Sequence, residues 1–171
     1  MLKSKIKWAL LFLVVIIFVG CITFRFVQIY RINKPFISHL DYDRNHGKAQ
    51  YYTSENGYVF TYKKASFFNI ECFASVSTEE DCKSYVDANG NLYTKGMQVT
   101  LFIWPIDHTY GILLYENDND RYVDEQIYID ENVNVLSNEY GYSETQEKYI
   151  ADNKEKINRL FRKANEKWEA W

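Results

Sequence analysis

Glycine, proline and the common catalytic motifs are scarce or absent in this sequence. Only seven Gly and two Pro occur among 171 residues, which excludes collagen-like and low-complexity chains. The sequence contains no G-x-S-x-G, H-E-x-x-H, P-loop or G-x-G-x-x-G motif, so it offers no recognisable residue set for nucleophilic, metal or nucleotide chemistry. We therefore predict no catalytic residues, no cofactor and no bound metal.

Acidic residues are absent from the first forty positions. The first 35 residues carry a net charge of +6, and the rest of the chain carries −9. The basic residues responsible flank a hydrophobic run and are Lys3, Lys5, Lys7, Arg25, Arg31 and Lys34. Basic flanks suit anionic lipid headgroups, whereas an acidic domain repels phosphate backbones. This distribution predicts a lipid bilayer as one partner and argues against nucleic acid as another.

A hydrophobic run without any charge extends from Trp8 to Phe24. Its seventeen residues span about 25 Å as a helix, slightly less than the ~30 Å hydrocarbon core of a bilayer. The apolar pattern continues past Arg25 to Tyr30, and Pro35 then marks its end. We predict a basic tail over residues 1–7, a transmembrane anchor helix over 8–30 and a juxtamembrane connector over 31–49.

Other interpretations of this run are open. A cleaved secretory signal requires a small-residue site such as A-x-A, which is absent. The four residues that end at Cys21, FVGC, resemble a lipobox in which Cys21 would be acylated, although Phe18 stands where Leu is usual. A buried core helix is the third alternative. We predict a retained, single-pass signal anchor in the cell inner membrane or plasma membrane.

The cysteines determine the side of the membrane that we predict for the domain. Beyond the anchor the chain holds only Cys72 and Cys82, and an isolated close pair predicts a disulfide formed in an oxidising compartment. The alternative is two unpaired thiols. The positive-inside count favours a cytoplasmic N-terminus by only about one charge. The expected disulfide therefore places the N-terminus in the cytoplasm and the domain in the periplasm or at the cell exterior.

Beyond the connector, residues 50–171 have the pattern of one extracytoplasmic α+β domain. Runs rich in β-branched and aromatic residues predict an antiparallel sheet of about five strands, at 58–62, 68–74, 99–104, 112–115 and 126–129. Alternation of apolar residues places Phe68 and Cys72 on one buried face. Asn56 and Gly57 predict a hairpin turn, and residues 78–86 resemble a short helix with acidic residues in its first turn.

The C-terminal residues have the clearest helical pattern. Ser143 and Gln146 form a capping-box pattern, and apolar residues then recur at helical spacing, at Ile150, Ile157, Leu160, Phe161, Ala164, Trp168 and Trp171. We predict an amphipathic helix of about 27 residues that covers the sheet. The functional alternative is that Trp168 and Trp171 extend past the sheet and contact a partner or lipid headgroups.

Acidic side chains are concentrated near the end of the strand region, with only Arg121 to balance them. They are Glu116, Asp118, Asp120, Asp124, Glu125, Asp130 and Glu131. A charge run of this kind is usually a solvated loop. The functional alternative is an acidic patch that binds a cationic protein surface or a weakly held Ca²⁺ ion.

The anchor, the acidic domain and the aromatic content together predict a noncatalytic interaction module displayed from a membrane to a protein partner. One specific form is an immunity-type protein that neutralises a toxin. The alternatives are an accessory structural subunit of a membrane complex, which the lack of a G-x-x-x-G motif does not favour, and an envelope hydrolase that uses carboxylate pairs. The carboxylates considered are Glu71, Asp107, Glu116 and Asp124. Abundant Lys, Asn, Ile and Tyr, without an N-x-S/T site, are typical of a bacterial protein.

Overall fold

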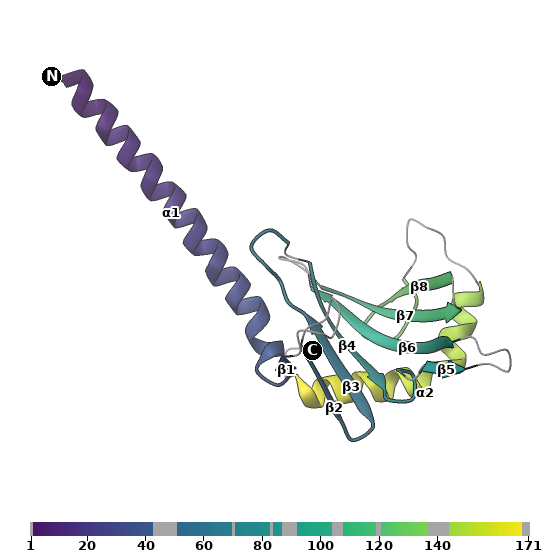
Figure 1. Ribbon diagram of the computed structural model, residues 1–171. Helices are drawn as coiled ribbons and strands as arrows, with labels where there is room; N and C mark the ends of the chain where they lie inside the picture. The colour runs from purple at the N-terminus through teal and green to yellow at the C-terminus, as the bar shows by residue number, and fades with distance from the viewer. Residues whose placement is uncertain are drawn as a thin grey trace.

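A computed structural model describes residues 2–42, 51–69, 71–82, 84–86, 92–103, 108–118, 121–136 and 144–168 of the chain (Figure 1). A long N-terminal helix, α1 (Leu2–Ile37), leads into an antiparallel sheet, and a second long helix, α2 (Glu144–Lys167), follows the sheet. The strands are β1 (Asp41–Tyr42), β2 (Tyr51–Glu55), β3 (Tyr58–Lys63), β4 (Cys72–Thr78), β5 (Ser84–Val86), β6 (Leu92–Ile103), β7 (His108–Asp118) and β8 (Arg121–Ile129).

The sheet is larger than the five strands that the sequence predicts. Seven strands lie in the order β1-β2-β3-β4-β6-β7-β8, each antiparallel to its neighbours, and β5 pairs with β6 outside this row. The predicted α+β class, with one long helix at each end of the chain, is confirmed. The predicted strands at 58–62, 112–115 and 126–129 fall within β3, β7 and β8, whereas those at 68–74 and 99–104 only overlap β4 and β6. The additional strands have only two to five residues each, too few for a clear alternation pattern.

The β2–β3 hairpin has the geometry that its turn residues favour. Asn56 and Gly57 have positive φ angles of 52° and 80°, the combination found in a type I′ turn, whose twist matches that of the paired strands. Glu55 pairs directly with Tyr58 across this two-residue turn. The hairpin turn predicted from the sequence is confirmed.

The short helix predicted over residues 78–86 is wrong. The hydroxyl of Thr78 donates to the carboxylate of Asp81 at 2.6 Å and accepts from the Asp81 N–H at 3.1 Å, which forms a turn. Residues 84–86 then pair with β6 as β5. Lys156 of α2 forms an ion pair of 2.8 Å with Asp81, so the acidic residue that suggested a helix start instead joins a turn to α2.

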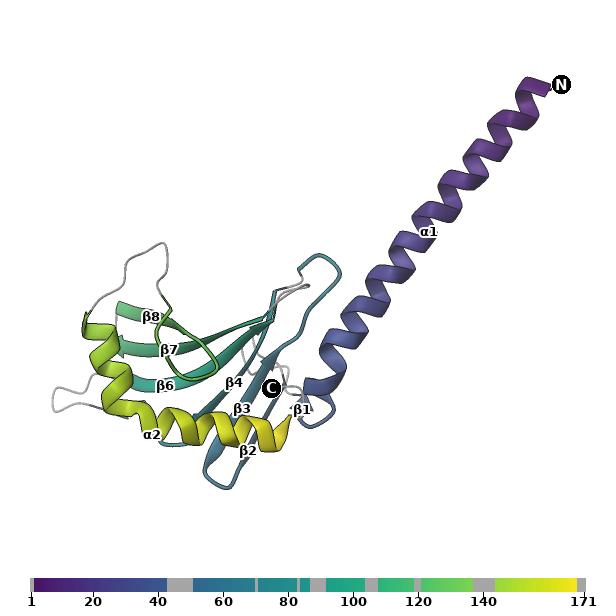
Figure 2. The ribbon, with the colours of Figure 1, turned by 180° about the vertical axis from the view of Figure 1, so that it is seen from behind.

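One face of the sheet is covered by α2. The helix lies in front of the sheet in Figure 2 and behind it in Figure 1. Its buried residues are Ile150, Ile157, Leu160 and Ala164, which confirms the apolar stripe predicted from the sequence. They belong to one hydrophobic core with the fully buried Val76, Val99 and Ile112 of the sheet.

Among the described residues, α1 is long and apolar enough to cross a membrane, with its candidate span at Leu10–Ile37. This property is consistent with a signal anchor or a signal sequence. The helix is longer than predicted, because it continues through Pro35 to Ile37 and includes part of the expected connector. Proline removes one hydrogen bond from a helix, and burial of Asn33 and Phe36 against the sheet domain offsets that loss. Residues 43–49 of the expected connector lie outside the described residues.

Candidate functional site

The last turns of α1 are part of the folded domain. Asn33 is only 5% exposed, and its side-chain nitrogen donates to the carbonyl of Ala65 at 3.0 Å. Its side-chain oxygen accepts two hydrogen bonds of 2.9 Å, one from the Ala65 N–H and one from the Tyr62 hydroxyl. Buried polar groups with a full set of partners hold a defined geometry. The carboxamide therefore fastens α1 to the end of β3.

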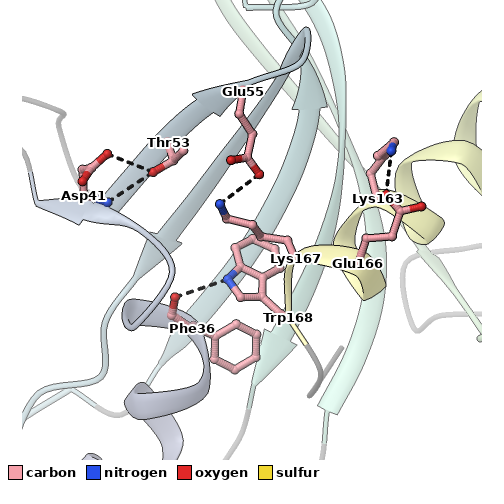
Figure 3. Close-up of polar contacts among 8 residues, drawn as sticks. All are labelled: Phe36, Asp41, Thr53, Glu55, Lys163, Glu166, Lys167 and Trp168. Carbon is pink, nitrogen blue, oxygen red and sulfur yellow. Dashed lines mark hydrogen bonds and ion pairs between the residues drawn. The ribbon is translucent and has the colours of Figure 1, made fainter.

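Phe36 and Trp168 complete the junction between the two helices and the sheet (Figure 3). The Phe36 ring stacks on Tyr62 with centroids 4.9 Å apart and lies 5.6 Å from the Trp168 ring. The indole N–H of Trp168 donates to the Phe36 carbonyl at 3.2 Å. Trp168 is completely buried, so it is a core residue and not the partner contact that the functional alternative requires. Trp171 lies outside the described residues.

Polar contacts reinforce the same end of the domain. Lys167 of α2 forms an ion pair of 2.9 Å with Glu55 of β2, and the Thr53 hydroxyl donates to the Asp41 carboxylate at 3.2 Å (Figure 3). These surface contacts contribute little stability individually. They join α2 to β2 and β1 to β2, whereas the buried junction joins α1 to the sheet.

The face of the sheet opposite α2 carries no helix among the described residues and is seen in Figure 1; we call it the open face. Three neighbouring cross-strand partners at its centre bear hydroxyl groups: Thr61 of β3, Ser75 of β4 and Thr100 of β6. We call these three residues the hydroxyl row. The oxygens of Thr61 and Ser75 lie 2.6 Å apart, and Ser75 also donates to the side-chain oxygen of Gln98 at 3.4 Å. The row places short polar side chains in the middle of this face.

The hydroxyl of Thr100 is the exception in this row. Thr100 is 1% exposed, and its Oγ1 has no hydrogen-bond partner among the residues that the structure describes. A buried polar group without a partner costs about 1–3 kcal/mol. The neighbour of Thr100 in β7 is Gly111, and a Cβ atom at that glycine would lie 3.0 Å from the Phe102 ring. Any larger residue at position 111 would therefore crowd the Phe102 ring, which explains the glycine. Nothing in the packing of the described domain explains why the Thr100 hydroxyl is buried without a hydrogen bond.

Aromatic rings border the hydroxyl row on the side nearer α1. Phe102 lies with its ring centroid 6.3 Å from Phe73 and 6.3 Å from Tyr128, and the ammonium group of Lys63 lies 5.8 Å from the centre of the Phe73 ring. All four side chains are half-buried. Aromatic side chains beside hydrogen-bonding groups are typical of the centres of protein interfaces. The open face thus combines a polar centre with an aromatic border.

The sequence interpretation does not identify the open face. The available signal is the run FASVST in β4, where Ser75 and Ser77 alternate with the buried Ala74 and Val76. Small polar residues on the second face of a central strand indicate a face without a hydrophobic cover. The cross-strand register needed to join Ser75 to Thr61 and Thr100 comes only from the structure.

The six acidic residues of the predicted patch whose backbone is described are spread over β7, β8 and the turn after β8. Asp130 and Glu131 directly follow β8, whereas Asp124 lies six residues earlier, about 20 Å away along the strand. The described backbone places Glu116 and Asp118 near the end of β7, and Asp124 and Glu125 in the middle of β8. Asp120 lies outside the described residues.

The carboxylates considered for a hydrolase are also separated. Glu71 precedes β4 at the end of the sheet nearer α1, whereas Glu116 lies at the far end of β7. The register pairs Glu116 with Val123 and Asp124 with Tyr115, so the two acidic residues are not cross-strand partners. Asp107 lies outside the described residues.

Asp130 organises a turn after β8. Its Oδ1 accepts from the backbone N–H groups of Asn132 and Asn134 at 2.9 and 2.8 Å, and its Oδ2 accepts from the Asn134 side chain at 2.9 Å. These hydrogen bonds, first among them the one from the Asn134 backbone, hold the pKa of Asp130 below its usual range. The turn brings Val133 into the core with a positive φ of 63°. Asp130 therefore stabilises a loop.

The structure contradicts the predicted Cys72–Cys82 disulfide, because no disulfide joins these two residues. Cys72 begins β4, whereas the sulfur of Cys82 lies 3.0 Å from the hydroxyl of Ser77 near the other end of that strand. Five residues of extended chain separate Cys72 from Ser77 by about 17 Å, and a disulfide requires Cα atoms within about 7 Å. Cys72 is buried, as the strand pattern predicts, and burial raises the pKa of its thiol.

Within the described residues, no group of three or more His, Cys, Asp or Glu side chains is placed to hold a metal ion. The chain matches no protein-family model, no curated protein and no solved structure. The functional inference therefore rests on the open face and on the junction between α1 and the domain.

Proposed function

We propose that this protein is a single-pass, membrane-anchored and noncatalytic binding module whose open face contacts a protein partner. The observation that carries the proposal is the buried Thr100 hydroxyl without a partner at the centre of that face. Because this hydroxyl is buried in the free domain, a partner reaches it only by displacing the half-buried side chains beside it. A polar group of the partner that then bonds to the hydroxyl would remove a cost that the free domain bears. Phe73 and Phe102 supply adjacent apolar surface of the kind found at interface centres.

The junction between α1 and the sheet supports this proposal. Asn33 and Phe36 join the anchor to the core, so the open face keeps a constant direction relative to the membrane. A partner that approaches along the membrane, or that is itself membrane-bound, meets the same surface each time, which lowers the orientational cost of binding. An immunity-type role, in which the partner is a toxin, is one specific form of this proposal.

The proposed side of the membrane rests on the charges around α1. Lys3, Lys5 and Lys7 precede the hydrophobic run together with the terminal amine, whereas three basic residues follow it. This difference favours a cytoplasmic N-terminus and an extracytoplasmic domain. The sequence also favoured an extracytoplasmic domain because a Cys72–Cys82 disulfide would need an oxidising compartment. The structure has no such disulfide, so this second argument no longer applies.

Site-specific photocrosslinking in intact cells tests the binding face. A photoreactive phenylalanine replaces Phe102 on the open face or, as the matched control, Arg159, which is exposed on α2. We expect the full-length protein to form a discrete adduct with a protein partner from position 102 and none from position 159. The adduct from position 102 should weaken when Thr100→Val removes the unsatisfied hydroxyl.

Equal adducts from both positions, or no adduct from position 102, would contradict binding through the open face. An adduct from position 102 that Thr100→Val leaves unchanged would show that the Thr100 hydroxyl does not contribute to binding. Mass spectrometry of the adduct identifies the partner and decides whether it is a toxin.

A further inference from the structure

Among the described residues of the folded domain, the most exposed large hydrophobic side chain lies in the turn between β3 and β4. Phe68 is 96% exposed, and the adjacent Phe67 is 36% exposed. The sequence pattern predicts Phe68 on the buried face of a strand, but β4 begins only at Cys72. Isolated surface hydrophobics are common, but two adjacent phenylalanines on one turn form a local apolar surface.

Hydrogen bonds hold this turn in a defined shape. The Ser66 N–H donates to the Asn69 carbonyl at 2.7 Å, and the Asn69 N–H donates to the Ser66 hydroxyl at 3.1 Å. Ala65, which precedes the turn, is fixed to the buried Asn33 of α1. The two phenylalanines are therefore presented on a fixed turn, which we call the Phe67–Phe68 turn (Ser66–Asn69).

The Phe67–Phe68 turn lies beside α1 near the end of its charge-free run. The rings of Phe67 and Phe26 have centroids 5.4 Å apart, and Arg25 donates to the Phe67 carbonyl at 3.4 Å. Phe26 precedes Phe36 by ten residues, which is about 15 Å along the helix. Figures 1 and 2 both show the β3–β4 loop extending from the sheet alongside the C-terminal half of α1.

This position matches the edge of a bilayer that α1 would span. The charge-free run from Trp8 to Phe24 covers about 25 Å, about 5 Å less than a typical hydrocarbon core. The next helical turn contains Phe26, which is the residue that Phe67 contacts. The Phe67–Phe68 turn therefore adds apolar side chains at the level where α1 leaves the hydrocarbon.

The charges around the turn suit a lipid surface. Five basic side chains and one acidic side chain, Glu71, occur in residues 24–37 and 63–71 together. The basic residues are Arg25, Arg31, Lys34, Lys63 and Lys64. Basic residues next to an exposed apolar turn are the usual combination for contact with anionic headgroups.

We propose that the Phe67–Phe68 turn inserts into the bilayer interface beside α1, as a second membrane contact of the domain, with Lys63 and Lys64 at the level of anionic headgroups. The bilayer is the occupant that these observations favour, because the turn lies against the membrane-spanning helix itself. This inference rests on the proposed membrane anchor. The resulting two-point contact would hold the domain close to the membrane and limit the tilt of α1 and the domain together.

Spin labels on the full-length protein, reconstituted in phosphatidylcholine vesicles that contain phosphatidylglycerol, test this proposal. Single cysteines replace Phe68 in the turn, Ile16 in α1, or the exposed Thr145 at the start of α2, which is about 35 Å along α2 from Trp168. Cys21 and Cys82 are changed to Ser, and the buried Cys72 is retained. The protein without an added cysteine must remain unlabelled.

We expect the labels at positions 16 and 68 to collide more often with oxygen than with a water-soluble nickel complex, and the label at 145 to show the reverse. Lys64→Glu should move the label at 68 toward water. If position 16 is in lipid and 68 is in water, this inference is wrong and the anchor stands. If both are in water, the anchor itself is wrong. A label at 68 that neither reagent reaches would indicate burial in protein, for example in a second copy, and would overturn the lipid contact.

Discussion

The hydroxyl of Tyr62 in β3 donates a hydrogen bond of 2.9 Å to the side-chain oxygen of Asn33 in α1. Because Asn33 also bonds to both backbone groups of Ala65, one buried carboxamide joins α1 to the sheet. Here the helix and the domain share a core, so the stability of the domain depends on residues of the helix.

Asn33→Ala should strongly destabilise the domain. The change leaves the Tyr62 hydroxyl and both backbone groups of Ala65 without their partner, and buried groups of this kind cost about 1–3 kcal/mol each. We expect a loss of about 3 kcal/mol in the free energy of unfolding, against about 1 kcal/mol for Tyr62→Phe, which removes only one of the bonds. Urea unfolding in micelles measures both. Arg31→Ala, at an exposed position of the same helix, is the control, and equal losses for Asn33→Ala and Arg31→Ala would refute the role of the carboxamide.

Trp168 should behave as a core residue. It is completely buried between Phe36 and Phe60, so Trp168→Ala should cost about 3–5 kcal/mol. Trp168→Phe retains an aromatic ring but loses the hydrogen bond to the Phe36 carbonyl, and should cost about 1–2 kcal/mol. Thermal unfolding with the exposed Asn165→Ala as control measures these losses. A Trp168→Ala variant as stable as the control would mean that Trp168 is available to a partner after all.

The elements with strong periodicity could be predicted from the sequence. The apolar stripe of α2 at Ile150, Ile157 and Leu160 is buried as predicted, because a 3.6-residue period specifies one helix face whatever it packs against. The Asn56-Gly57 turn is also local, since its positive φ angles follow from the two residues themselves. The long apolar helix at the N-terminus could likewise be predicted from its local sequence.

The features that depend on distant partners could not be predicted. Asn33 and Ala65 are 32 residues apart in the sequence, and the type of neither residue indicates that they form hydrogen bonds with each other. Alternation placed Phe68 in a strand because the hydrogen bonds of Ser66 with Asn69, which end that regularity, are not visible in the pattern. The spacing of Cys72 and Cys82 suggested a closed loop, whereas an extended strand fills most of the interval.

The two cysteines of the domain should differ in reactivity. In a Cys21→Ser background, a membrane-impermeant maleimide should label the exposed Cys82 in intact cells without reductant. Cys72 should stay unlabelled until the protein unfolds, because it is buried and burial raises the pKa of its thiol, so that little reactive thiolate forms. Labelling that requires reductant would demonstrate a disulfide and contradict the structure. Labelling of Cys82 only after lysis would place the domain in the cytoplasm.

The turn around Asp130 should make stability depend on pH in the acidic range. A carboxyl group whose pKa is lower in the folded state stabilises the protein above its unfolded pKa of about 4, and this contribution is lost as the pH falls through the folded pKa. The pKa of Asp130 is lowered chiefly by hydrogen bonds from Asn134. We expect Asp130→Asn to be less stable than the wild type at neutral pH, with the difference shrinking on acidification. A difference that is independent of pH would show that the charge of Asp130 does not matter.

Thr100→Val should separate the stability of the domain from its proposed binding. The substitution removes a buried hydroxyl that has no partner among the described residues, so the free domain should gain about 1 kcal/mol rather than lose stability. Ser75→Ala is the matched control, because the Ser75 hydroxyl lies 2.6 Å from that of Thr61 and its removal should cost about 1 kcal/mol. Chemical unfolding of the three proteins measures both effects. A Thr100→Val protein that is clearly less stable than the wild type would mean that the hydroxyl already has a partner in the free protein, and the main argument for a ligand at the open face would fail.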